Sequence, residues 1–351
     1  MQRTRKNMQR VLLINQGHTP NLGDIAIAKV MENFFSQQGY ITETMPYDEQ
    51  VEQVFSLPLD RNDLLPKSML RLSPVMDALN HRRIRRLLND KHFDFAVIGG
   101  GELLGRHFGF NSSFVSWCSE LSSRKIPIYV TGVSGDLHMQ DYYLNRYRKA
   151  LRKCVYVSAR DHSTERILHE RYGIEAHYSP DVVFAYNHLF KSQHDTDKKD
   201  IVCVPVPCKK EQLQALGLQS ENDYFRYLAN LISQHNEEAT KKVIITSTVQ
   251  TDEAIVHRFA QYCSAHTSYD IAVRPYPALD EFMHLIDQAN YTISGRMHAC
   301  ILGLISGSRI IPIPFKEKLA VFAQEYSSAD NIEKVSEEAY QGLIHITRQQ
   351  S

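Results

Sequence analysis

The stretch YTISGRMHACILGLISGSRIIPIPF, residues 291–315, contains a complete strand–helix–strand pattern. Its two ends, 291–295 and 309–315, are rich in residues that favour strands, and they flank a run, 296–306, that is apolar on nearly every side. A helix that is apolar all round is buried, and buried strands beside it are typical of a parallel sheet covered by helices. The stretch therefore predicts a βαβ unit inside an α/β domain.

Short apolar runs continue to alternate with longer amphipathic stretches over most of the chain, in both directions from this unit. The further strands that we expect are 11–15, 94–100, 126–132, 155–159, 201–206, 242–247 and 270–275. The helices that we expect between them include 24–37, 161–172, 221–236, 252–265 and 278–288. This order predicts the α/β class, with two doubly wound, Rossmann-like domains facing a cleft.

The polar stretch KSQHDTDKKD, residues 191–200, separates the two series of strands. We interpret it as an interdomain linker, because it joins two periodic segments and has no apolar pattern of its own. An N-terminal α/β domain is then expected at 1–190 and a C-terminal α/β domain at 201–351. A length of 351 residues fits two hydrophobic cores better than one.

The composition argues against a nucleic-acid-binding protein, a zinc protein and a membrane-spanning protein. The 40 basic and 40 acidic residues give a formal net charge of zero, so nothing global indicates a nucleic-acid partner. The six cysteines form no C-x-x-C pair, which argues against a zinc site, and we expect neither a metal nor a disulfide framework. The first apolar run, VLLI before Asn15, is too short for a signal peptide, and no run is long enough to span a membrane. A cytoplasmic location is expected.

The segment 67–91 differs from its surroundings because it holds seven Lys or Arg residues and two Asp. Two interpretations remain open. The segment is a surface helix packed on the first domain, or it is a basic amphipathic helix that contacts the inner face of a membrane or a lipid-linked substrate.

Ligands of parallel sheets bind beyond the carboxyl ends of the strands, where helix N-termini present unpaired N–H groups. Three such places precede the quoted stretch. Asp24 follows the first strand and either caps the next helix or contacts a ligand. The run Gly99–Gly101 follows a buried strand and either lets a ligand approach the backbone or serves packing alone. Arg160 follows the strand 155–159 and either binds an anion or pairs with Asp161.

The fourth place is the quoted stretch itself, where Arg296 and His298 are expected in the first helical turn and facing away from the core. A cation at a helix N-terminus is unfavourable unless an anion neutralises it. Lys316 and Lys318 follow the next strand and add positive charge. A multiply anionic ligand would explain this charge, whereas the alternatives are an ion pair at the domain interface for Arg296 and a satisfied interior histidine for His298.

Five motifs together give the chain a family resemblance. They are NLGDIAI (21–27), VIGGGELL (97–104), VSARDHSTERIL (157–168), SPDVVF (179–184) and SGRMHACILGLISGSRIIPIPFKEK (294–318). In this order they resemble the polysaccharide pyruvyl transferase family, over nearly the whole chain. The last motif is the most specific of them.

The resemblance implies a GT-B-like fold and a transferase that uses phosphoenolpyruvate as donor substrate, without a further cofactor. The acceptor would be a hydroxyl pair on a sugar or a lipid-linked oligosaccharide, and the product a pyruvate ketal on a surface or exopolysaccharide unit. Guanidinium groups suit this donor because they bind carboxylate and phosphate bidentately, and histidine suits proton transfer near neutral pH. Arg160, Arg296 and His298 match the family positions that hold or act on the donor. Met297 stands where the family commonly has leucine.

These matches define the expected site. His298 is the expected acid and base, and the donor contacts are Arg160, Arg296, Met297 and, more weakly, Lys318. The acceptor-side candidates are Asp24, Gly100, Gly101 and Glu102. Two other function classes remain open: a GT-B glycosyltransferase that uses a nucleotide sugar, and a non-catalytic glycan-binding relative.

Overall fold

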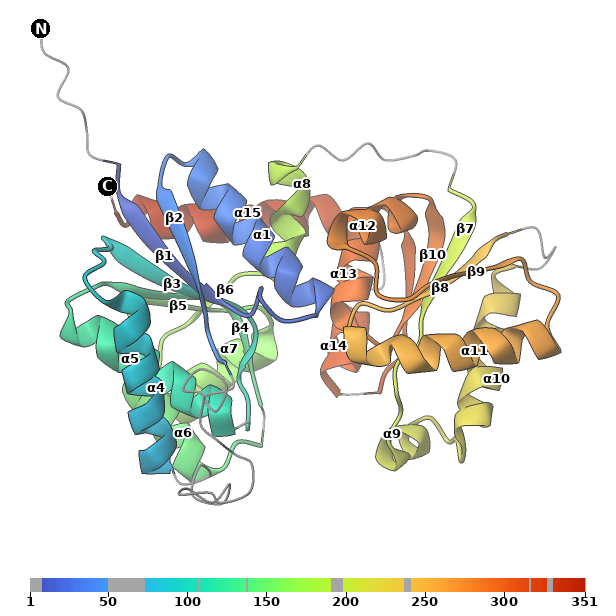
Figure 1. The fold of residues 1–351 in the computed structure, drawn as a ribbon, viewed down its shortest axis with the longest axis horizontal. Helices are drawn as coiled ribbons and strands as arrows, with labels where there is room; N and C mark the ends of the chain where they lie inside the picture. The colour runs from blue at the N-terminus through green and yellow to red at the C-terminus, as the bar shows by residue number, and fades with distance from the viewer. Residues whose placement is uncertain are drawn as a thin grey trace, which may run out of the picture. The chain divides into compact units, whose positions relative to one another are not determined.

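The computed structural model describes residues 8–49, 73–106, 108–136, 138–190, 198–236, 241–315, 317–326 and 331–350. The chain divides into two compact units, each with its own sheet (Figure 1). Unit 1 falls within Met1–His18, Ile27–Ala185 and Glu338–Ser351. Unit 2 falls within Thr19–Ala26 and Tyr186–Glu337.

The described strands of unit 1 form a six-stranded parallel sheet in the order β2-β1-β3-β4-β5-β6. Nearly every residue of the central strands is buried, as expected for strands covered by helices on both faces. Their bounds are β1 (Arg10–Asn15), β2 (Ile41–Pro46), β3 (Phe95–Leu104), β4 (Ile128–Gly135), β5 (Tyr156–Ala159) and β6 (His177–Tyr178).

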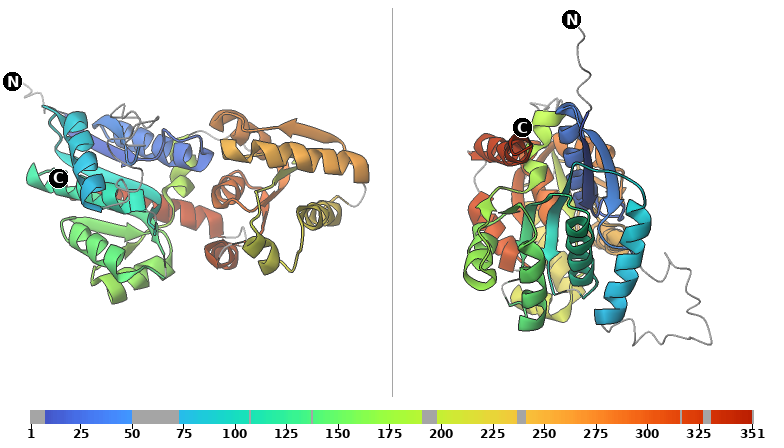
Figure 2. Two further views of the ribbon diagram at one scale, coloured as in Figure 1. Left: turned by 60° about the horizontal axis from the view of Figure 1, so that its bottom comes forward. Right: turned by 90° about the vertical axis from the view of Figure 1, so that its left-hand side faces the viewer.

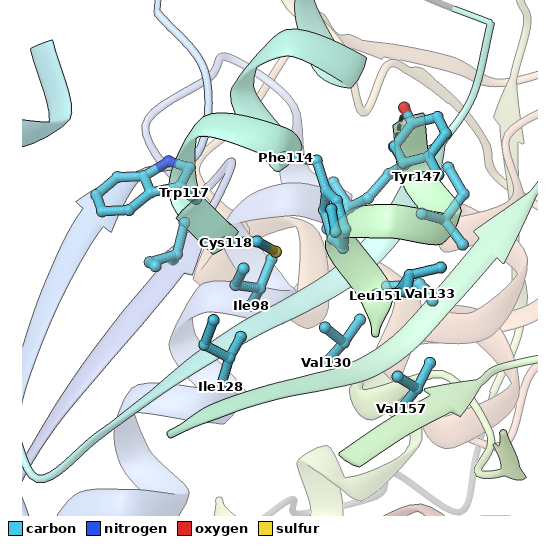
Figure 3. Close-up of a cluster of buried hydrophobic side chains, with 14 of the residues drawn as sticks. Ile98, Phe114, Trp117, Cys118, Ile128, Val130, Val133, Tyr147, Leu151 and Val157 are labelled. Atoms are coloured by element: carbon cyan, nitrogen blue, oxygen red, sulfur yellow. Dashed lines mark hydrogen bonds between the residues drawn. The ribbon is translucent and has the colours of Figure 1, made fainter. Parts of the chain in front are cut away.

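Helices cover both faces of this sheet (Figures 1 and 2). On one face the core joins the helices α4, α5 and α6 to the strands. Figure 3 shows Phe114 and Trp117 of α5 beside Ile98 and Val130 of the sheet. The indole Nε1 of the fully buried Trp117 donates to the Tyr47 carbonyl at 3.0 Å. Burial of this side chain therefore leaves no N–H group without a hydrogen bond. The helical segments are α1 (Leu22–Gln37), α4 (Ser73–Leu88), α5 (Phe108–Ser123), α6 (Asp141–Leu151), α7 (His162–Ile167), the π-helical turn η1 (Leu168–Tyr172), the 3₁₀ turn η2 (Val182–Ala185) and α15 (Ile332–Arg348).

The described strands of unit 2 form a five-stranded parallel sheet in the order β11-β10-β7-β8-β9. One face packs on α10 and α11, and the other on α12 and α13 (Figure 1). The strands are β7 (Asp200–Val204), β8 (Val243–Thr246), β9 (Ile271–Arg274), β10 (Ala289–Ser294) and β11 (Arg309–Pro312). The helical segments are α8 (Tyr186–Leu189), α9 (Lys210–Ala215), α10 (Glu221–Gln234), the 3₁₀ turn η3 (Gln250–Asp252), α11 (Glu253–His266), α12 (Leu279–Asp287), α13 (Met297–Ile305) and α14 (Glu317–Tyr326).

The predicted βαβ unit is present as β10, α13 and β11. From Ala299 to Ile305 the helix is buried at every position, which matches a run that is apolar all round. Strand β10 pairs in parallel with both β11 and β7. The helix packs on β10 and the edge strand β11, and its first turn lies at the carboxyl end of β10.

The division into units differs from the expected domains 1–190 and 201–351 in three places, because tertiary contacts cross the expected boundary. Residues Thr19–Ala26 belong to unit 2, where they pair with the segment after β8. Residues from Tyr186 also belong to unit 2, since the Asn187 amide donates to the Ile305 carbonyl at 2.6 Å. The last part of α15 belongs to unit 1, where the Tyr340 ring packs on Phe34 at 5.6 Å. Of the expected linker, residues 191–197 lie outside the described residues.

The basic segment 67–91 is described from residue 73 onward, and there it forms α4. Its Arg83 is buried and donates to the carbonyls of Pro46 and Tyr47 at 3.2 and 3.0 Å. Arg85 pairs with Glu120 of α5 at 2.9 Å. These contacts fit a helix packed on the first unit, and membrane contact stays a prediction.

Candidate functional site

The order of the strands in unit 2 reverses between β7 and β10. From β7 the chain builds β8 and β9 on one side and then returns to build β10 and β11 on the other. The helices that follow β7 and β10 pack on opposite faces of the sheet, so the carboxyl ends of these two strands form a topological switch point. The quoted stretch turns from β10 into α13 at this switch point, which is where parallel sheets most often bind ligands.

A tight turn joins β10 to α13. The Ser294 hydroxyl accepts from the Arg296 N–H at 2.9 Å, and Arg296 precedes the first helical residue in an extended conformation. A side chain at Gly295 would place its Cβ 2.6 Å from Cε2 of Phe315 and 2.9 Å from Cγ2 of Val206, so the turn requires glycine. Arg296 is the N-cap residue, whereas the sequence had placed it in the first helical turn. Met297 and His298 are the first two helical residues, so the prediction for His298 is confirmed.

The guanidinium of Arg296 is bound by Asp252, a residue that the sequence did not identify. Arg296 Nε donates to Oδ2 at 2.8 Å and Nη2 donates to Oδ1 at 2.7 Å, a bidentate pair. The Asp252 side chain is 2% exposed, whereas that of Arg296 is 37% exposed. Burial raises the pKa of Asp252 above its ordinary value, and the neighbouring Arg296 opposes that rise.

This pair changes the electrostatic argument made from the sequence. The anion that neutralises Arg296 at the helix N-terminus is a carboxylate of the same unit. Arg296 therefore forms an ion pair, as one of the two alternatives predicted. The pair lies within unit 2, whereas that alternative placed it at the domain interface. Nη1 of Arg296 has no hydrogen-bond partner among the described residues, so this part of the guanidinium is available to a ligand.

His298 is half-buried and lies against Gly23, from the N-terminal segment that belongs to unit 2. A Cβ built on Gly23 would lie 2.5 Å from Cγ of His298 and overlap Nδ1. Backbone bonds fix this segment, because Leu22 N donates to Thr248 O at 2.8 Å and Gln250 N donates to Pro20 O at 3.1 Å. The imidazole of His298 therefore packs directly against the backbone of Gly23, where a larger residue would overlap the ring. We refer to Arg296, His298, Asp252 and Gly23 as the β10–α13 site.

Asp24 lies in this same unit and not in the N-terminal unit to which we had assigned it. It does not cap α1 either: the helix begins at Leu22, and the Asn21 side chain accepts from Gly23 N at 3.0 Å. Asp24 Oδ2 accepts from the Thr19 hydroxyl and the Asn21 amide, both at 2.9 Å. These bonds order the loop that presents Gly23 to His298.

The other predicted donor contact, Arg160, lies in unit 1 at the end of β5. Its Nη1 donates to Asp181 Oδ2 at 2.8 Å and its Nη2 donates to the Ser134 hydroxyl at 2.8 Å. Arg160 is 7% exposed. The pairing with Asp161, one of the two alternatives for Arg160, is absent, since Asp161 accepts from Thr164 N at 2.7 Å and caps α7. The structure thus gives Arg160 a buried structural pair and leaves its donor role a prediction.

The three remaining acceptor-side candidates lie together near the end of β3. Gly100 and Gly101 have φ angles of 80° and 87°, which favour glycine. A Cβ on Gly100 would also overlap the Ile27 side chain, so close packing accounts for this glycine. Glu102 is the exposed residue of the strand. No observation ties these three residues to an acceptor, and their role stays a prediction.

Lys316 lies outside the described residues. Lys318 falls in α14, and its side chain is not among those described. All six cysteines are free thiols. In the part of the chain that the structure describes, no cluster of three or more His, Cys, Asp or Glu residues could hold a metal ion. Within the same ranges, no helix is both long and apolar enough to cross a membrane.

Comparison with solved structures shows what the fold resembles. The UDP-GlcNAc 2-epimerase from Methanocaldococcus jannaschii is 12% identical, with a TM-score of 0.60 over 97% of this chain and 99% of that chain. The UDP-GlcNAc 2-epimerase from Neisseria meningitidis bound to UDP-GlcNAc is 11% identical, with a TM-score of 0.52 over 97% and 99%. At these identities the likeness shows the fold alone, and it confirms the predicted class of two Rossmann-like, GT-B-like units.

A search among curated protein sequences finds no match. A family model for polysaccharide pyruvyl transferase matches residues 21–314, from the segment that carries Gly23 to one residue before the end of the quoted stretch. This match includes every residue of the β10–α13 site. The chain therefore belongs to the polysaccharide pyruvyl transferase family.

Proposed function

We propose that this protein transfers pyruvate from phosphoenolpyruvate to two hydroxyls of a sugar and forms a cyclic ketal on a surface or exopolysaccharide unit. The observation that carries the proposal is the placement of Arg296 and His298 at the switch point of unit 2, within the region that the family model matches. The acceptor is a sugar or a lipid-linked oligosaccharide, and transfer takes place on the cytoplasmic side.

The donor carries a phosphate and a carboxylate, and the site offers two kinds of group for such anions. Nη1 of Arg296 is not used by Asp252. The N–H groups at the start of α13 provide the second kind, because the first turn of a helix has no backbone acceptor and carries a partial positive charge. The proposed donor position therefore lies over the first turn of α13, next to His298.

His298 serves as general acid and then as general base. Its proton goes to the methylene carbon of the donor, and the first sugar hydroxyl forms a bond to the central carbon. The bond from this carbon to the phosphate oxygen then breaks, phosphate leaves, and the second hydroxyl closes the ketal. Of the two hydroxyl protons, one returns to His298 and the other leaves with phosphate. An imidazole suits both steps because it exchanges its proton near neutral pH.

One alternative has support from the fold comparison. A similar solved structure is described as bound to UDP-GlcNAc, and a Staphylococcus aureus protein with a TM-score of 0.53 as a complex with UDP. A glycosyltransferase that uses a nucleotide sugar is therefore the second candidate. Thermal-shift titration with phosphoenolpyruvate and with UDP-GlcNAc separates the two. Stabilisation by phosphoenolpyruvate is expected, and stabilisation by UDP-GlcNAc alone would rule out the proposed donor.

A non-catalytic relative is distinguished by its dependence on His298. If the protein only binds glycans, His298→Ala leaves its biological role intact. Loss of ketal formation in a folded His298→Ala variant that still binds phosphoenolpyruvate is the result expected of an enzyme.

A further inference from the structure

We infer that Asp252 is a positioning residue for the donor: it holds one edge of the Arg296 guanidinium so that the Nη1 group is presented to phosphoenolpyruvate. The identity of the donor in this inference rests on the proposed function. The orientation of Arg296 by Asp252 does not depend on it. Asp252 occupies Nε and Nη2 at 2.8 and 2.7 Å, and no described residue accepts from Nη1.

Asp252 is itself fixed in place. Its side chain is 2% exposed, and its backbone N–H donates to the Val249 carbonyl at 2.9 Å. Val249 forms an isolated antiparallel bridge with Asn21. The segment that carries Asp252 is thus paired with the segment that presents Gly23 to His298. One backbone pairing, between residues 20–22 and 248–250, sets the position of both functional side chains.

The alternative role for Asp252 is competition, in which the carboxylate occupies Arg296 until the donor displaces it. The burial of Asp252 argues against this, because a released carboxylate would remain inside the protein without its counter-ion. A flexible arginine also loses side-chain freedom when it binds, and a guanidinium that is already oriented avoids most of that loss. A fixed pair with one open edge therefore favours donor binding over a free arginine.

The two roles predict opposite effects of Asp252→Asn. The amide keeps the shape of the side chain but removes its charge and one acceptor for the guanidinium. Positioning predicts that the dissociation constant for phosphoenolpyruvate rises about tenfold to a hundredfold, as misplaced substrate contacts commonly cause. Competition predicts tighter binding. Calorimetric titration of phosphoenolpyruvate into the full-length protein measures the difference, and an unchanged or lower dissociation constant overturns the inference.

Asp77→Asn is the matched control. Asp77 forms an equally bidentate pair with Arg146 in unit 1, with distances of 2.9 and 2.7 Å. Loss of that pair is expected to lower the melting temperature and to change the dissociation constant for phosphoenolpyruvate by less than about twofold. If both variants weaken donor binding equally, the effect of Asp252 is one of general stability and the inference fails.

A spectroscopic measurement tests the pair without any donor. In protein labelled with ¹⁵N-arginine, the Arg296 Nε–H signal is expected to be protected from solvent exchange and to lose that protection in Asp252→Asn. Rapid exchange in the unchanged protein would contradict the inference. If protection is seen but phosphoenolpyruvate does not bind the unchanged protein, the proposed donor is wrong and the orientation of Arg296 by Asp252 stands.

Discussion

Each unit contains an Arg-x-His sequence where a parallel strand turns into a helix, and the two are used differently. In unit 1, Arg160 and His162 follow β5; in unit 2, Arg296 and His298 follow β10. Strand β5 lies two strands away from β3, which pairs with β1 at the switch point of its sheet, whereas β10 borders the switch point of the other sheet. The same local pattern thus stands at different places in the topology.

The surroundings of the two arginines differ accordingly. Arg160 donates from both terminal nitrogens to partners in unit 1, and its side chain is 6% exposed. Arg296 keeps Nη1 available and is 37% exposed. His162 is exposed and pairs with Glu165 at 2.9 Å, whereas His298 is held against Gly23. Both terminal nitrogens of Arg160 are thus used by partners in its own unit, whereas Arg296 keeps one terminal nitrogen for the proposed donor.

The largest expected effect separates the two histidines. His298→Ala should lower pyruvyl transfer by about 10²–10⁴-fold, the usual contribution of a general acid and base. His162→Ala should leave transfer within about twofold, because exposed ion pairs contribute little. Initial rates of pyruvyl transfer are measured for both variants with saturating phosphoenolpyruvate. Equal losses of rate in the two variants would contradict a catalytic role that is specific to His298.

The second effect separates the two arginines. Arg296→Lys keeps a cation for Asp252 but loses the guanidinium fork, so the dissociation constant for phosphoenolpyruvate should rise by about tenfold or more. Arg160→Lys should instead lower the free energy of unfolding by about 1–3 kcal/mol, because it leaves buried partners unsatisfied. Calorimetric titration and urea unfolding of both variants measure the two effects.

The reverse outcome would support the family match for Arg160. Weaker donor binding in Arg160→Lys at unchanged stability would assign Arg160 to the donor, as its matched position implies. The contrast between a structural and a binding arginine would then be wrong.

A third, smaller effect tests how the β10–α13 site is held. Gly23→Ala introduces a methyl group that overlaps His298, so the ring must move, and we expect about a tenfold loss of kcat. Gly135→Ala in unit 1 is the control, since its added Cβ would meet ordinary contacts of 3.6–3.8 Å. Full activity of Gly23→Ala would show that the contact does not position the imidazole.

The smallest effect concerns the anchoring of the helix that carries His298. Cys300 is fully buried in α13, and burial raises the pKa of its thiol to about 12. The neutral thiol therefore stabilises the fold below its ordinary pKa of 9.0, and this contribution is lost as the pH rises from there towards about 12. Cys300→Ala should flatten that alkaline loss of stability.

The same burial gives a chemical test of the helix. At pH 8, iodoacetamide should modify Cys300 no faster than the protein unfolds, as followed by peptide mass spectrometry. Fast modification under native conditions would mean that α13 is not a rigid support for Arg296 and His298.

The sequence predicted the parts of the fold that have strong local patterns. The nearly continuous apolar runs of β3, β4, β7 and β8 identify central parallel strands. The two parallel sheets and the likeness to solved structures confirm the fold class. Strand β2 was missed because an edge strand with the sequence ITETMP has few apolar residues, and it is buried mainly at Met45. Strand β6 has two residues, too few for a pattern.

The contacts within the site join residues that lie far apart in the sequence, and no local sequence pattern predicts such contacts. Asp252 is 44 residues from Arg296 in sequence and resembled an ordinary helix start. The sequence gives no sign that the loop around Gly23 belongs to unit 2, because its pairing with residues 248–250 is a tertiary contact. The locations of Arg296 and His298 were predictable from the strand before them; the partners that orient them were not.

The central claim is that the β10–α13 site transfers pyruvate from phosphoenolpyruvate to a glycan. The most direct measurement incubates the protein with phosphoenolpyruvate labelled with ¹³C in its carbon skeleton and with the lipid-linked glycans of cells that make this protein. Mass spectrometry then follows the glycan, and a phosphate assay follows the leaving group. We predict one labelled pyruvate ketal for each phosphate released, and no ketal with His298→Ala. Release of phosphate without a labelled glycan, or equal labelling by His298→Ala, would contradict the claim.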